Sequence, residues 1–129
     1  MSPRTGRPTD NPKKNRLEIR LSDTENNLLE KDSQKSKATK TELLMEGYAM
    51  SRLITGEELK ERLIKEYENL TEINRKSQRL IQEVQSKDCP FTEEEKLKVI
   101  EHSEESIKQN DWVCKVIKNQ LKREFGYEI

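Results

Sequence analysis

The chain has 129 residues, of which 39% are charged, 30% hydrophobic and 5% aromatic, and its formal net charge is zero. This composition is too poor in apolar residues for the large core of a typical enzyme, so burial must come from helix pairing and from association between chains. Zero net charge also argues against a protein whose whole surface coats nucleic acid.

Residues 1–14 contain all but one of the four prolines and are predicted to form a flexible basic arm, because they cannot bury enough apolar surface to fold. Residues 1–21 carry six basic and two acidic side chains, so this end of the chain is the candidate phosphate-binding region. The arm's candidate DNA contacts are Arg4, Arg7, Lys13 and Lys14. A disordered tail without contacts is the alternative.

Residues 15–21 alternate between polar and apolar side chains, which predicts a β-strand. One face carries Leu17, Ile19 and Leu21, and the other carries Arg16, Glu18 and Arg20. Because the rest of the chain has helical patterns, we expect the strand to pair with the same segment of a second copy as an antiparallel ribbon. Such a ribbon fits the DNA major groove. An ordinary half-exposed edge strand is the alternative.

Two capping boxes predict a pair of helices after this strand. Ser22 with Glu25 opens a helix over residues 23–35, and Thr39 with Glu42 opens a second one. The unit of strand, helix and helix is predicted to cover residues 15–54.

Residues 55–129 are predicted to form a long helical extension. Apolar positions recur over residues 57–86 and 93–124, with a capping box at Thr92 and Glu95, and a short loop between two such helices favours an antiparallel hairpin. A parallel stalk remains open. Asn110 and Asp111 indicate a bend or break. The neighbouring apolar residues form either bundle core or an exposed patch, and they are Trp112, Val113 and Val116.

Several classes of function are excluded by what the sequence lacks. No apolar run reaches the roughly 18 residues of a membrane helix, and no signal peptide is evident, so we expect a cytoplasmic protein without a membrane partner. Cys89 and Cys114 fit no metal-ligand spacing and are interpreted as reduced thiols, and His102 is the only histidine. We therefore expect no enzyme activity, metal, cofactor or small-molecule substrate.

The stretch Arg16-Leu17-Glu18-Ile19-Arg20-Leu21-Ser22, followed by two capped helices, resembles the ribbon-helix-helix family of DNA-binding proteins, and Asn15 to Ser22 is similar to the opening of its CopG-type plasmid repressors. The resemblance covers residues 6–52. It has two departures, Lys37 where the family turn usually has glycine, and Glu18 on the groove-facing surface. It implies base contacts by Arg16, Glu18 and Arg20 and phosphate contacts by Thr39, Lys40 and Thr41. The expected dimer core consists of Leu17, Ile19, Leu21, Leu28, Leu43, Leu44 and Tyr48.

The expected fold is therefore mainly α, with a ribbon-helix-helix unit followed by a helical hairpin or stalk. Small proteins of this family with helical extensions resemble the accessory proteins of plasmid relaxosomes. The resemblance implies a homodimer, or a tetramer, that binds double-stranded DNA sequence-specifically at a transfer origin and recruits a relaxase through residues 55–129. The alternatives are a transcriptional repressor of plasmid copy number, partition or its own gene, and an antitoxin-like protein-interaction module.

Overall fold

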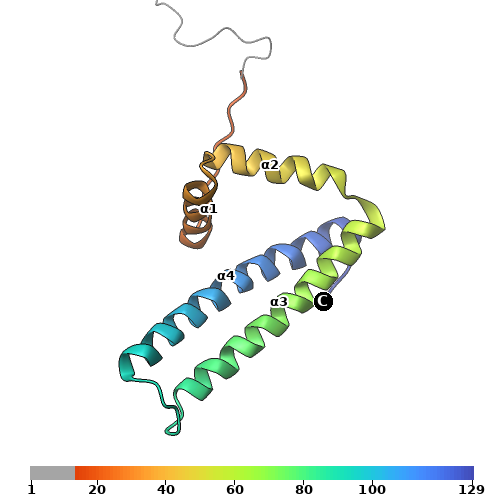
Figure 1. Cartoon of the computed structure of the whole chain (residues 1–129). Helices are drawn as coiled ribbons and strands as arrows, with labels where there is room; N and C mark the ends of the chain where they lie inside the picture. The colour runs from red at the N-terminus through yellow and green to blue at the C-terminus, as the bar shows by residue number, and fades with distance from the viewer. Residues whose placement is uncertain (1–13) are drawn as a thin grey trace, which may run out of the picture.

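The computed structural model describes residues 14–129, which form four helices (Figure 1). The helices are α1 (Asp23–Ser36), α2 (Lys40–Leu53), α3 (Gly56–Val84) and α4 (Glu93–Phe125). The two long helices, α3 and α4, run antiparallel as a hairpin, and the two short helices lie above it in Figure 1. The prediction of a mainly α chain with four helices is confirmed for these residues, and of the two arrangements left open for residues 55–129 the structure shows the folded-back hairpin.

Both short helices begin at the predicted capping boxes. The Glu25 N–H donates to Ser22 Oγ at 3.2 Å, and the Ser22 N–H donates to Glu25 Oε1 at 2.9 Å. Thr39 and Glu42 make the same reciprocal pair, at 3.1 and 3.3 Å. These bonds satisfy backbone N–H groups that have no partner within a first helical turn.

The turn between α1 and α2 depends on a residue in a left-handed conformation. Lys37 has φ 59° and ψ 26°, a region that glycine occupies at less steric cost than other residues. The Ser33 hydroxyl donates to the Ala38 carbonyl at 2.6 Å and closes the turn from the side of α1. Lys37 therefore adopts the left-handed conformation although it is not glycine.

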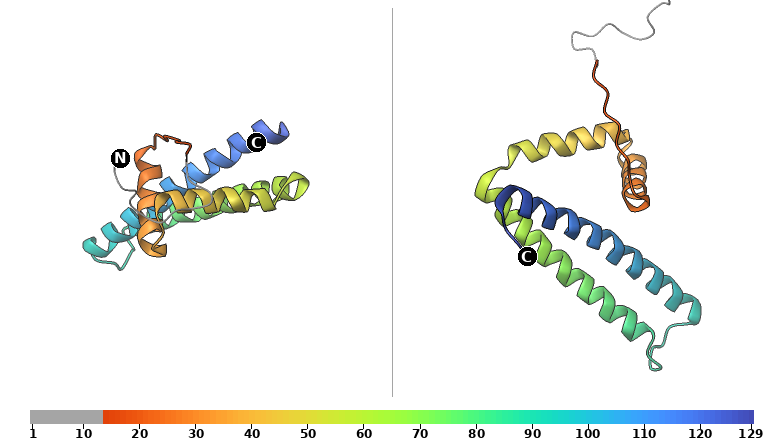
Figure 2. Two further views of the ribbon diagram at one scale, coloured as in Figure 1. Left: turned by 90° about the horizontal axis from the view of Figure 1, so that it is seen from above. Right: turned by 180° about the vertical axis from the view of Figure 1, so that it is seen from behind.

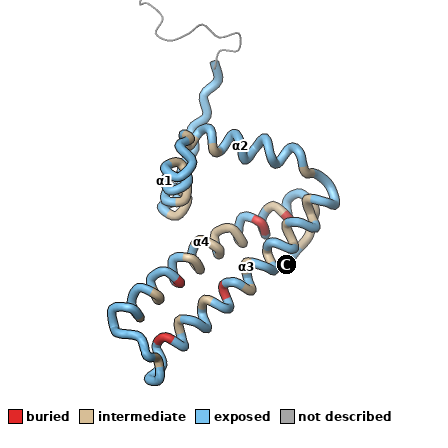
Figure 3. The backbone as a smooth tube through the Cα atoms, viewed as in Figure 1, coloured by how far each residue is buried: buried red, intermediate tan, exposed pale blue. Residues whose placement is uncertain are grey.

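The small core lies between α3 and α4 (Figure 3). Its buried apolar residues are Val84, Ile117 and Leu121, and Leu121 is completely buried. Two polar residues, Asn74 and Ser103, are buried on the facing sides of the same two helices. Among residues 14–129 the hairpin is thus the part that contains the buried core.

The short helices are attached to the hairpin at few points. Within residues 14–129, α1 packs against α2 and against α4, whereas α2 has no packing contact with the hairpin. The views in Figure 2 show α2 spanning from α1 to the start of α3 as one side of an open frame. As a result α2 has no buried residue.

The predicted strand at 15–21 is wrong. Residues 14–22 have no regular secondary structure, and no strand or sheet occurs among the described residues, so the antiparallel ribbon is not found. Alternating polar and apolar residues would lie on opposite sides of an extended segment, but this pattern supplies no partner for the backbone N–H and C=O groups. A strand requires such a partner, and residues 14–129 offer none.

Two smaller expectations also need correction. Helix α4 continues through Asn110 and Asp111 without a break, because both side chains bond across the hairpin to Asn74. At the start of α4, Thr92 accepts from the Glu95 N–H as predicted, but the Glu95 carboxylate accepts from the Thr92 hydroxyl, at 3.1 Å. The third capping box is therefore only half formed.

Candidate functional site

The strongest candidate for a binding region is the N-terminal segment, residues 14–22. Its cations, Lys14, Arg16 and Arg20, are exposed, and only Arg16 takes part in an ion pair within residues 14–129, with Glu18 at 2.6 Å. Both partners of that pair are more than three-quarters exposed, so the pair contributes little to stability. The other arm candidates, Arg4, Arg7 and Lys13, lie outside the described residues.

The segment carries its apolar residues in the open as well. Leu17 is 83% exposed and Ile19 53%, and Leu21 is also exposed. Because the segment is not a strand, its charged and apolar side chains are not assigned to opposite faces. The assignment of base contacts to Arg16, Glu18 and Arg20 consequently stays a prediction without the ribbon geometry that motivated it.

The start of α2 is the second region predicted to contact DNA. The Thr39 hydroxyl is engaged in the helix cap, and the Lys40 ammonium group lies 2.7 Å from Glu30 Oε2 and 2.9 Å from Asn26 Oδ1. Thr41 is exposed. Lys40 therefore ties α2 to α1, and its charge is partly neutralised before any phosphate approaches.

Helix α2 presents an exposed apolar surface, which we call the α2 surface. It consists of Leu44, Met45 and Tyr48, which lie within about 100° of one another around the helix. Met50 and Leu53 are also exposed, Leu53 by 74%, but they point to other sides of α2. Leu44 and Tyr48 are four positions apart and share one face of the helix. Of the other residues predicted for the dimer core, Leu28 and Leu43 are half-buried.

Trp112 makes a contact that sequence reasoning missed. Its indole N–H donates to Glu25 Oε2 at 3.1 Å, which joins α4 to the first turn of α1. The ring is half-buried, so it is neither hairpin core nor a fully exposed patch. The hydrogen bonds from Ser22 and Trp112 lower the pKa of the Glu25 carboxyl. A bond between residues 87 positions apart has no local signature in the sequence.

A polar layer crosses the middle of the hairpin. Asn74 donates to Asp111 Oδ1 at 2.9 Å and accepts from Asn110 Nδ2 at 3.0 Å. Beside this layer, burial raises the pKa of the Cys114 thiol, and a hydrogen bond with Thr71 partly offsets the shift. The layer satisfies its own polar groups, which is typical of a device that fixes helix register.

Comparisons with known proteins do not place the chain in a family. No family model, curated protein or solved structure matches it. Within residues 14–129, no group of three or more His, Cys, Asp or Glu side chains is arranged to hold a metal ion. None of the helices in this range has an apolar stretch long enough to cross a bilayer.

Proposed function

We propose that this chain is a homodimeric double-stranded DNA-binding protein that contacts phosphates through the cations of its N-terminal segment and binds a second protein through its hairpin. The observation that carries the proposal is the exposure of Lys14, Arg16 and Arg20 on a segment without regular structure. Such side chains can follow the phosphates of a duplex without first breaking packed contacts.

The arrangement of the chain supports separate binding regions for DNA and for a second protein. The N-terminal segment leads into the short helices, at the opposite end of the molecule from the loop of the hairpin (Figure 1). The hairpin exposes apolar side chains that DNA would not bind but a protein could, including Leu80, Leu97 and Val116. An accessory factor that binds a transfer origin and recruits a relaxase is the specific form of such an adaptor that the sequence resemblance favours.

A second copy of the chain is the occupant proposed for the α2 surface. Helix α2 has 14 residues and is therefore about 21 Å long. Two such helices, together with the exposed apolar residues of the N-terminal segments, offer each chain an apolar contact for a symmetric interface, and a standard interface of this kind buries roughly 800 Å² per partner. A two-fold arrangement buries the same patch on both chains, and it doubles the cations available to one duplex.

The salt dependence of DNA binding tests this proposal. Fluorescence anisotropy with a labelled duplex should give an affinity that falls steeply between 50 and 200 mM salt, with a slope of about 0.9 for each phosphate that the protein neutralises. A slope equivalent to several phosphates supports the proposal. The absence of binding to any of a pool of random-sequence duplexes at low salt would contradict it and favour a protein-interaction module.

A further inference from the structure

Only two connections hold the short helices to the hairpin within residues 14–129. One is the chain itself between α2 and α3, and the other is the contact between α1 and α4. Ile54 and Thr55 have extended backbones, Gly56 has φ 64°, and the Thr55 side chain makes no capping bond to α3. A hollow of about 450 Å³ borders this connection, and Thr55 and Gly56 are exposed, so residues 54–56 can act as a hinge.

The second connection depends on one carboxylate. Glu25 Oε1 accepts from the Ser22 N–H and completes the α1 cap, while Glu25 Oε2 accepts from the Trp112 indole. Lys115, less than one turn further along α4, adds an electrostatic attraction to the same carboxylate. The Glu25 carboxylate, which completes the cap of α1, therefore also holds α1 against the hairpin.

Trp112 owes its burial to this contact. It precedes Leu121, which is completely buried, by nine positions, or roughly two and a half helical turns, so the two residues lie on opposite faces of α4. The indole thus projects from the side of α4 that is turned away from α3. Within the described residues α1 is the helix that packs there, and separating α1 from α4 would expose the ring to water.

We infer that Glu25 and Trp112 form a latch, which holds the hairpin against α1 and, when released, lets the hairpin swing about residues 54–56. The closed state has the indole bonded and half-covered, and the open state has it exposed. This conformational device does not depend on DNA binding, because every contact in it lies within one chain.

The chain's one tryptophan makes the latch directly measurable. Glu25→Ala should shift the Trp112 emission to longer wavelength and strengthen its quenching by acrylamide. Asp32→Ala removes the same charge from an exposed position of the same helix and should leave both properties at parent values. Small-angle scattering should give a larger radius of gyration for Glu25→Ala than for Asp32→Ala.

A third variant separates the latch from the helix cap. Ser22→Ala removes the hydroxyl that accepts from the Glu25 N–H but leaves the carboxylate that binds Trp112. Its emission and quenching should stay close to those of the parent. Parent-like fluorescence of Glu25→Ala would overturn the inference. An equal red shift in Ser22→Ala and Glu25→Ala would also overturn it, because the change would then follow fraying of α1.

Discussion

The polar layer of the hairpin leads to a quantitative prediction for Asn74→Ala. Asn74 is only 8% exposed and forms one bond with the Asn110 amide and one with the Asp111 carboxylate. Loss of a neutral bond costs about 1 kcal/mol, and loss of a bond to a charged group costs somewhat more. Asp111 is exposed and can be rehydrated, which limits the penalty. We therefore expect the free energy of unfolding to fall by about 2 kcal/mol.

Urea unfolding followed by circular dichroism measures this change, and for 129 residues the same loss lowers Tm by about 7 °C. The matched control is Asn69→Ala, which removes an exposed asparagine from the same helix and should change stability little. Asn74→Leu should recover most of the loss, because an apolar side chain of similar size suits the seam. An Asn74→Ala variant within about 0.5 kcal/mol of the control would refute the reasoning.

Three further predictions concern single positions. Lys37→Gly should raise the free energy of unfolding by about 0.5 kcal/mol, because removing the steric cost of a left-handed lysine outweighs the greater flexibility that glycine gives the unfolded chain. A free energy of unfolding below that of the parent, measured by urea unfolding, would count against this. Leu44→Glu should convert the proposed dimer to a monomer in light scattering after gel filtration, whereas a dimer mass that the substitution leaves unchanged would remove the α2 surface from the interface. The pKa of Glu25 is lowered in the folded chain, so its contribution to stability is complete above the ordinary pKa of a glutamate and is lost as pH falls through the folded value. Trp112 emission should consequently shift to longer wavelength in acid, and an emission that stays constant until the helices unfold would contradict this.

Local signals predicted the helices well because the groups that start them are neighbours in sequence. Ser22 with Glu25, and Thr39 with Glu42, each carry donor and acceptor three positions apart, so their bonds follow from the sequence. The strand failed for the opposite reason, since its alternating pattern specifies side-chain faces but not a backbone partner. The left-handed turn at Lys37 formed although the local residue preference opposes it.

The candidate site was only partly accessible to sequence reasoning. The exposure of Lys14 and Arg20 follows from composition, but the pairing of Lys40 with Glu30 depends on how α1 and α2 fold back on each other. The bond of Trp112 to Glu25 requires the whole path through the hairpin to be known. Contacts between residues so far apart in sequence depend on how the helices pack, and the local sequence pattern around each residue does not specify that packing.

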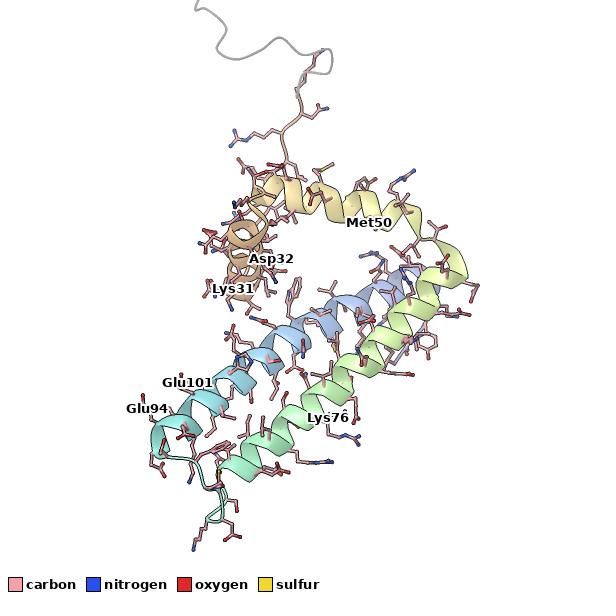
Figure 4. The ribbon with its side chains drawn as sticks, in the orientation of Figure 1. Lys31, Asp32, Met50, Lys76, Glu94 and Glu101 are labelled. Carbon is pink, nitrogen blue, oxygen red and sulfur yellow. The ribbon has the colours of Figure 1, made fainter. Side chains whose placement is uncertain are left out.

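The most direct test of the proposed function is DNA binding by a variant that lacks two cations of the N-terminal segment. Lys14→Ala combined with Arg20→Ala should weaken binding and reduce the salt slope by about 0.9 for each phosphate that the variant no longer neutralises. The control is Lys76→Ala combined with Arg79→Ala, which removes the same charge from the exposed side of α3, where Figure 4 shows Lys76. The account predicts parent-like affinity and slope for the control. Equal reductions in the two double variants, or no reduction in the first, would contradict it.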